Sequence, residues 1–280
     1  MGHPVGIFGT MVWFSAMLLM AAAGERPTTY PGYKLVWNDE FNSPGKPDPK
    51  NWVFEEGFVR NEELQWYQPE NAWVQDGHLI IEGRRETKTN PQFETGSTDW
   101  RKNRPTAAYT SSCLETRGLH EFQYGRFEIR AKIDARPGLW PAIWTLGVTG
   151  DWPKNGEVDQ LEYYRDMILA NTAWGNSIWN SVRTPYEKFT AKDPNFGKKF
   201  HVWRMDWDEA FIRIYLDNQL LNETDLTKTI NPDGSNAFHR PEFLLLNLAI
   251  GSTGGDPSKT SFPSRFEFDY VRVYQKSAGH

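Results

Sequence analysis

Three acidic residues in one short segment are the strongest candidates for chemistry in this sequence. The segment GEVDQLE, residues 156–162, places Glu157 and Asp159 two positions apart, so both side chains share one face if the segment is a β-strand. Glu162 lies five positions after Glu157 and joins that face only if a β-bulge inserts one extra residue. Carboxylates gathered on one face repel one another and lose solvation together. Because of this cost, an arrangement that keeps the three carboxylates together indicates a functional role.

Glycosidic bond cleavage is a reaction that needs such carboxyl groups. In retaining glycoside hydrolysis, two carboxyl groups lie roughly 5–5.5 Å apart across the scissile bond. One attacks the anomeric carbon, and the other donates a proton to the leaving oxygen. The alternative interpretation is a solvated acidic strand edge, with or without a cation. The spacing alone leaves both interpretations open.

Other kinds of catalytic centre are not indicated. The sequence has no glycine-rich phosphate loop, no Gly-x-Ser-x-Gly and no His-Glu-x-x-His motif. Its six histidines form no pair at a metal-ligand spacing. The single cysteine, Cys113, excludes an internal disulfide and a cysteine-ligated cluster within one chain. Its alternating surroundings predict a small buried strand residue.

The segments that must position the carboxylates alternate between apolar and polar residues, which is typical of β-strands. No stretch keeps an apolar stripe of helical period over three turns. We therefore predict an all-β fold, a sandwich of two packed sheets in one domain. The clearest strand candidates are residues 33–37, 78–82, 126–133, 211–216, 243–248 and 265–274.

Composition narrows the class of protein further. The chain has 280 residues, 39% of them hydrophobic and 24% charged, which excludes a multi-span membrane protein. Its net charge of -5 gives no electrostatic footprint for nucleic acid. Aromatic residues make up 15% of the chain, including 13 tryptophans, which suggests stacking surfaces for a ligand besides core packing.

The N-terminus reads as a targeting segment. The apolar run at residues 11–23 has the length of a signal-peptide core, and Ala21, Ala22 and Ala23 offer a cleavage site. The run is short for a membrane span. An uncleaved anchor or a mis-assigned start is the alternative, because residues 1–10 contain no Lys or Arg. We predict a signal peptide at 1–23 and a secreted or periplasmic domain at 24–280, without stable membrane association.

The acidic segment resembles the active-site strand of glycoside hydrolase family 16 in its bulged, laminarinase-like form, Glu-x-Asp-x-x-Glu. Further segments resemble the family's motifs in the family's order, across residues 33–275. The resemblance implies a β-jelly-roll of two curved antiparallel sheets with a substrate cleft on the concave face. The matching segments are LVWNDEF (35–41), RNEELQWY (60–67), YGRFEIRAK (124–132), GLWPAIW (138–144), FHVWRMDW (200–207) and DYVRVY (269–274).

The resemblance also implies roles for individual residues. Glu157 would be the nucleophile, Glu162 the acid/base, and Asp159 would tune the charge of the nucleophile. Glu157 must then be ionised and Glu162 protonated before the reaction. The tryptophans could instead pack in the core, and among them Trp140 and Trp207 are the favoured ligand contacts. The implied substrate-binding residues are Asn61, Glu63, Trp140, Trp144, Trp152 and Trp207.

Many family members hold a structural calcium ion on the convex side. Glu40, the backbone carbonyl of Gly77 and Asp269 stand at the matching positions here. Oxygen ligands suit calcium, and the alternative is a set of unliganded polar groups at strand ends. No cofactor is expected for catalysis.

The implied activity is retaining endo-hydrolysis of β-1,3- or mixed β-1,3-1,4-glucans such as laminarin and lichenan, by a monomer. The alternatives are an algal galactan (agar, porphyran or carrageenan), transglycosylation, and a non-catalytic glucan-binding protein, against which the intact carboxylates argue. The net acidity disfavours sulfated galactans, which would need Lys or Arg in the cleft. Two departures leave the linkage open: Asn171 and Trp174 stand where laminarinases often have histidines, and residues 251–256 lack a tryptophan.

Overall fold

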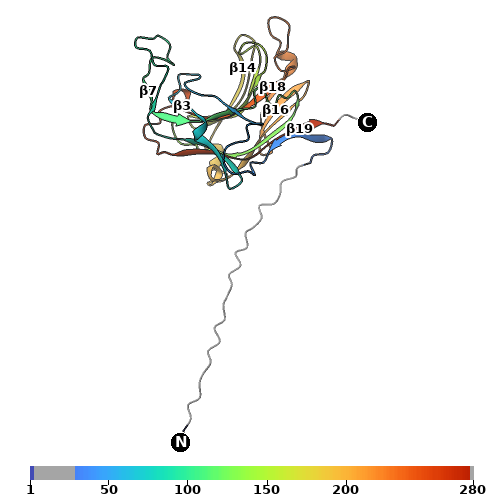
Figure 1. Ribbon diagram of the computed structural model, residues 1–280. Helices are drawn as coiled ribbons and strands as arrows, with labels where there is room; N and C mark the ends of the chain where they lie inside the picture. The colour runs from blue at the N-terminus through green and yellow to red at the C-terminus, as the bar shows by residue number, and fades with distance from the viewer. Residues whose placement is uncertain (3–28, 278–280) are drawn as a thin grey trace.

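The computed structural model describes residues 1–2 and 29–277, so the predicted signal peptide lies almost wholly outside the described part (Figure 1). Strands dominate these residues, which confirms the all-β prediction. Among the described residues, no helix is long and apolar enough to cross a membrane. The helical segments are short: α1 (Glu187–Thr190) and the 3-10 turns η1 (Pro69–Asn71), η2 (Phe196–Lys198), η3 (Leu226–Lys228) and η4 (Ser252–Gly254).

Two antiparallel sheets form the body of the molecule. The first has the order β17-β16-β15-β10-β19-β5-β4, with β1 paired to β19. Its strands are β1 (Tyr33–Asp39), β4 (Ala72–Gln75), β5 (His78–Gly83), β10 (Gly125–Lys132), β15 (His201–Trp207), β16 (Phe211–Leu216), β17 (Gln219–Asp225) and β19 (Ser264–Lys276).

The second sheet carries the acidic segment and has the order β14-β13-β12-β11-β18-β9-β2. Its strands are β2 (Val53–Phe54), β9 (Cys113–Glu115), β11 (Leu139–Gly147), β12 (Glu157–Tyr164), β13 (Met167–Trp174), β14 (Ile178–Pro185) and β18 (Glu242–Ile250). Two small pairs complete the fold, β3 (Gln65–Tyr67) with β8 (Tyr109–Ser111) and β6 (Lys88–Thr89) with β7 (Thr106–Ala107).

The sheets pack face to face around one large apolar core, as in a β-jelly-roll. Alternation decides which side chains enter it: Phe127 and Ile129 of β10 and Leu244 and Leu246 of β18 are fully buried. Cys113 is also fully buried, in a smaller apolar cluster, which confirms that it is a strand residue shielded from solvent. Predicted fold class and structure therefore agree.

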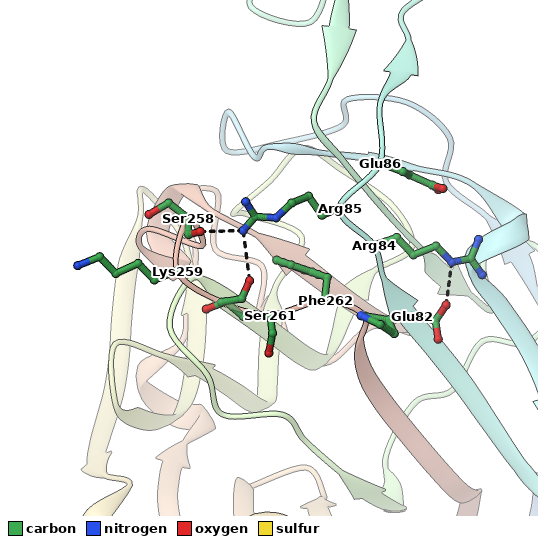
Figure 2. Close-up of a pocket in the computed structure, with 10 residues that line it drawn as sticks. Glu82, Arg84, Arg85, Glu86, Ser258, Lys259, Ser261 and Phe262 are labelled. Carbon is green, nitrogen blue, oxygen red and sulfur yellow. Dashed lines mark hydrogen bonds and ion pairs between the residues drawn. The ribbon is translucent and has the colours of Figure 1, made fainter.

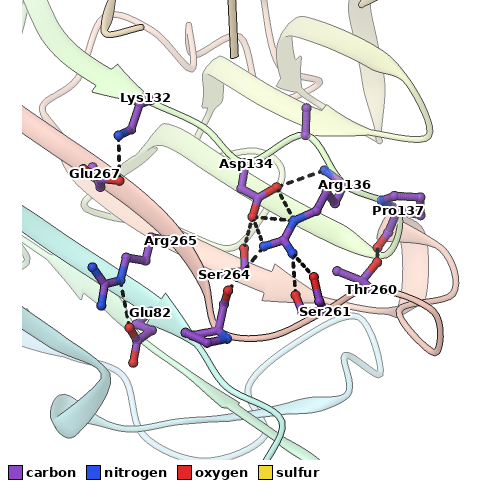
Figure 3. Close-up of polar contacts among 12 residues, drawn as sticks. Glu82, Lys132, Asp134, Arg136, Pro137, Thr260, Ser261, Ser264, Arg265 and Glu267 are labelled. Atoms are coloured by element: carbon purple, nitrogen blue, oxygen red, sulfur yellow. Dashed lines mark hydrogen bonds and ion pairs between the residues drawn. The ribbon is translucent and has the colours of Figure 1, made fainter. Parts of the chain in front are cut away.

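A loop between η4 and β19, residues 255–263, is held to the sandwich by hydrogen bonds from two arginines. The Arg85 guanidinium donates to the carbonyls of Pro257 and Ser258, each at 2.9 Å. Figure 2 shows the contact with Ser258. Arg136, ion-paired with Asp134, donates to the Ser261 carbonyl at 2.5 Å (Figure 3). These contacts fix the loop against the turn that precedes β11.

Only glycine at position 138 permits the close approach of the loop residue Pro257 to the turn before β11. A Cβ on Gly138 would lie 2.3 Å from the Pro257 nitrogen, and Gly138 has a φ of 77°. Gly138 is followed directly by Leu139 and Trp140, so the packing of the loop sets where β11 begins. The turn thereby positions the first tryptophan of the predicted cleft.

Candidate active site

A β-bulge in β12 brings the three carboxylates to one face of the sheet. In the ladder with β13, Asp159 pairs with Asn171 and Glu162 with Leu169, so β12 uses one residue more than its partner. The ladder with β11 shows the same shift, and Gln160 is the residue it leaves unpaired. The predicted bulge is confirmed.

A tight turn fixes the start of β12, where Glu157 lies. The Gly147 amide donates to the Gly156 carbonyl at 3.0 Å, and the Asn155 side chain donates to the Gly147 carbonyl at 2.8 Å. A Cβ on Gly147 would lie 1.9 Å from the Asn155 oxygen, so the turn requires glycine there. The loop closed by this turn carries Trp152 back to Glu157, and the Trp152 indole N–H donates to that carboxylate.

All three carboxylates line one cavity of about 660 Å³, on the face of the second sheet that points away from the core. Asn61, Glu63, Trp140, Trp144 and Trp152, predicted from the sequence, line the same cavity. The cavity also has lining residues that the sequence analysis did not name as site residues: Arg60, Arg117, Ala142, Leu146, Tyr164, Asn171, Trp179, Ser181, Arg183, Asn247 and Thr253.

The prediction that Trp207 contacts substrate is wrong. Trp207 lies on β15 in the opposite sheet, is only 3% exposed, and donates its indole N–H to the Phe238 carbonyl at 3.1 Å. Its ring packs edge-to-face against Tyr124, with centroids 5.4 Å apart. Trp203, Met205 and Trp207 alternate onto one face, which is the core face. The alternation of Trp203, Met205 and Trp207 along the sequence is the signal from which a core position for Trp207 could have been predicted.

Each catalytic candidate has its own hydrogen-bond environment. Glu162 accepts from the Trp140 indole at 2.8 Å and from the Asn171 amide at 2.7 Å. Asp159 accepts from the same amide at 3.0 Å, and it also hydrogen-bonds Glu157. Glu157 and Glu162 thus have separate indole donors, Trp152 and Trp140, whereas Asp159 and Glu162 share the Asn171 amide.

Burial is the largest influence on the pKa of all three groups. It raises the pKa of Glu162 to about 7, against the opposing effect of the Trp140 hydrogen bond. Burial and the neighbouring Glu162 and Glu157 raise the pKa of Asp159 well above its usual range. The pKa of Glu157 is also raised by burial, while donors from Trp152 and Asp159 oppose the rise. A neutral Asp159 can therefore donate to an ionised Glu157, and Glu162 is protonated at mildly acidic pH, as a general acid must be.

Polar groups beside the carboxylates suit sugar hydroxyls. Glu63 is buried and accepts from the Gln65 amide at 2.5 Å and from the Asn61 amide at 3.3 Å. Asn61 has a φ of 57°, and the Ser252 hydroxyl donates to its carbonyl. The Ser252 contact and the left-handed turn fix the backbone from which the Asn61 side chain extends.

Trp144 supports the floor of the cavity more than it offers a stacking face. Its indole N–H donates to Asn247 at 2.7 Å, and the Arg60 guanidinium lies 5.0 Å from its ring centroid. In contrast, Trp152 and Trp179 are 53% and 44% exposed, with ring centroids 6.4 Å apart. These two rings offer the open aromatic surface beside Glu157.

We expect Trp140→Ala to weaken substrate binding more than folding. Trp140 is only partly buried, contacts Tyr164 edge-to-face and donates to Glu162, so its loss removes cavity wall rather than core. A fully buried tryptophan would instead cost about 3–5 kcal/mol when replaced by alanine. Thermal unfolding and substrate affinity of this variant should be compared with those of Trp203→Phe, a change in the core. A large fall in melting temperature with unchanged substrate affinity would show that Trp140 serves core packing and not substrate binding.

The predicted calcium ligands have other partners. Both Glu40 oxygens accept 2.8 Å hydrogen bonds from Arg272, and Asp269 is ion-paired with Arg130. In the part of the chain that the structure describes, no three His, Cys, Asp or Glu side chains converge as a metal site needs. Carboxylates that are already paired with arginines are a poor fit for calcium, with or without the Gly77 carbonyl. The calcium ion is therefore not supported by these contacts and remains only a prediction from the sequence.

Comparisons with known proteins identify the family of this chain. The sequence model for Glycosyl hydrolases family 16 matches residues 86–272. A β-glucanase of Rhodothermus marinus is 32% identical, over 90% of this chain and 88% of that protein. A structure from work on endo-acting O-glycanases, with which prominent human gut bacteria initiate mucin breakdown, is 34% identical with a TM-score of 0.82, covering 90% of this chain and 94% of that one. The laminarinase catalytic domain of Thermotoga maritima is 32% identical with a TM-score of 0.73, covering 88% and 99%. The chain therefore belongs to glycoside hydrolase family 16 and is a glycoside hydrolase.

Proposed function

We propose that this protein is a secreted, monomeric, retaining endo-glycosidase that cleaves β-1,3- or mixed β-1,3-1,4-glucans. The observation that carries the proposal is the bulged strand, which directs Glu157, Asp159 and Glu162 into one cavity with different hydrogen-bond donors. The β-glucanase and the laminarinase domain described above support glucan as the substrate. The apolar run at residues 11–23 supports export.

The reaction would proceed in two steps. Glu157, held by the Trp152 indole, attacks the anomeric carbon while Glu162 passes its proton to the leaving sugar oxygen. The covalent glycosyl-enzyme is then hydrolysed by a water that Glu162, now ionised, deprotonates. A protonated Asp159 stabilises the Glu157 carboxylate by donating a hydrogen bond to it whenever that carboxylate is free. Trp140 and Asn171 remain donors to Glu162 through both steps.

A mucin-type O-glycan is a second candidate substrate, favoured by one comparison and by the cleft itself. The O-glycanase structure matches with a TM-score of 0.82, against 0.73 for the laminarinase domain. Beside its four carboxyl residues, the cavity is also lined by three arginines, Arg60, Arg117 and Arg183. Arg60 and Arg117 are ion-paired with glutamates, whereas Arg183 has no ion pair among the described residues. The Arg183 guanidinium is therefore available to form an ion pair with an anionic substituent on a glycan.

We expect the purified protein to release oligosaccharides from laminarin or lichenan, with internal cleavage visible as a rapid fall in polymer length. The same assay should include agarose, carrageenan and mucin O-glycans, with products identified by mass and linkage. Glu157→Gln serves as the matched inactive control, so that a contaminating activity is detected. Cleavage of mucin O-glycans with no attack on either glucan would replace the first candidate with the second. Inactivity on every polymer would contradict the proposed hydrolysis of these substrates.

A further inference from the structure

One amide on β13 contacts two of the three carboxylates. Asn171 is buried, and its Nδ2 lies 2.7 Å from a Glu162 oxygen and 3.0 Å from an Asp159 oxygen. The Ser181 hydroxyl on β14 donates to Asn171 Oδ1 at 2.5 Å. The three strands are neighbours, and their register places Asp159, Asn171 and Ser181 in one row across the sheet.

From this row we infer that Asn171, oriented by Ser181, is a positioning residue that lowers the proton affinity of Glu162 and fixes its orientation. The inference rests on the acid/base role proposed for Glu162. In this scheme Asn171 transfers no proton and forms no bond to the sugar; it acts through the Glu162 carboxyl that it contacts.

The chemistry of the amide explains the effect. An Asn side chain carries two N–H donors on nitrogen and a lone-pair oxygen, so only one of its two orientations offers protons to both carboxylates. With the amide reversed, its oxygen would face Asp159 and Glu162 and would repel their ionised forms. A hydroxyl that donates to Oδ1 favours the productive orientation, which is the role of Ser181.

This donor matters because Glu162 must both lose and regain a proton in each cycle. Burial alone disfavours the carboxylate that must accept a proton from water in the second step. Hydrogen bonds from Asn171 and Trp140 favour the ionised form and oppose that effect. The charged or titratable groups around the cavity, besides Asp159 and Glu162, are Glu157 and Tyr164 on the same strand, Arg183 on β14, Arg117 after β9, and Arg60 and Glu63 before β3.

The test measures the pKa of the Glu162 carboxyl directly. Protein carrying ¹³C-labelled glutamate is titrated by NMR, with the Glu162 signal assigned from its absence in Glu162→Gln. In Asn171→Ala we expect the pKa of Glu162 to rise by about one unit, the order expected for loss of one hydrogen bond to a charged group. Ser181→Ala should shift it in the same direction by less. Thr172→Val is the matched control, since Thr172 is the next residue on β13 but bonds Thr224 on the opposite face.

Kinetics give the second readout. For Asn171→Ala, the alkaline limb of kcat/KM should move upward with the Glu162 pKa, and kcat should fall more than KM rises. An unchanged Glu162 pKa in Asn171→Ala, or an equal shift in Thr172→Val, would overturn the inference. A pKa that rises without any movement of the alkaline limb would support the contact and refute the acid/base role of Glu162. The two failures are therefore distinguishable.

Discussion

Replacing Glu157 by Gln should lower the hydrolysis rate by at least about a thousandfold, as loss of a nucleophile does in other enzymes, while the protein still folds. Gln keeps an oxygen that can accept from the Trp152 indole, so the geometry of the cavity persists. It lacks the charge that attacks the anomeric carbon. The loss should therefore appear in kcat, with little change in substrate affinity.

The same substitution should leave stability unchanged or raised at neutral pH. Burial raises the pKa of Glu157 above its ordinary value of 4.5, so the folded protein binds this proton more tightly than the unfolded chain does. Stability from this group is full below pH 4.5 and is lost as pH rises through the folded pKa. Gln has no proton to lose, so the variant's advantage in melting temperature should grow from pH 4 to pH 7.

Glu242→Gln is the matched control for this prediction. Glu242 is a fully buried carboxyl on β18 that accepts from the Thr145 hydroxyl, and burial raises its pKa to about 8. It does not line the cavity. Its replacement should raise stability by an amount that grows as pH rises from 4.5 to about 8, because over that range the folded protein holds a proton that the unfolded chain has lost. The hydrolysis rate should stay within a few-fold of wild type. Activity of Glu157→Gln within tenfold of wild type would show that the nucleophile is another residue.

The carboxylates could be predicted from the sequence because their arrangement depends on one strand. Spacing within the acidic segment requires a β-bulge to align Glu162 with Glu157, and the strand ladders place that bulge at Gln160. The role of Asn171 could not be predicted in this way, since its contacts depend on the register between β12, β13 and β14. Register is a property of two paired strands, so it cannot be predicted from the sequence of one segment alone.

Trp207 and the cavity arginines show two further limits, with different causes. Motif position favoured Trp207 as a ligand contact, but alternation along β15 places it in the core. Net charge is a sum over the whole chain and says nothing about where the charges lie. The overall value of -5 is therefore compatible with a cavity lined by Arg60, Arg117 and Arg183. Local exposure, not composition, decides what a substrate meets.

Azide added to the Glu162→Ala and Glu157→Ala variants should restore turnover with products of opposite anomeric configuration. This difference should assign the roles of the two glutamates without reference to relatives. Glu162→Ala should lose most activity on polysaccharide, by roughly 10²–10⁴-fold, because proton transfer to the leaving sugar is lost. With an aryl glycoside, whose leaving group needs no proton, this variant should form the glycosyl-enzyme and then stall. Azide needs no base, so it should restore turnover and give a β-linked azide.

The structure supplies a reason why azide can enter each vacated site. Removing the Glu162 carboxyl leaves the Trp140 and Asn171 N–H groups facing the gap, and removing that of Glu157 leaves the Trp152 N–H. These donors suit a small anion. In Glu157→Ala, azide would attack the substrate itself from the face that the nucleophile left, so its product should be the α-azide. NMR of the two products decides the assignment, and an α-azide from Glu162→Ala would mean that the two glutamates have exchanged roles.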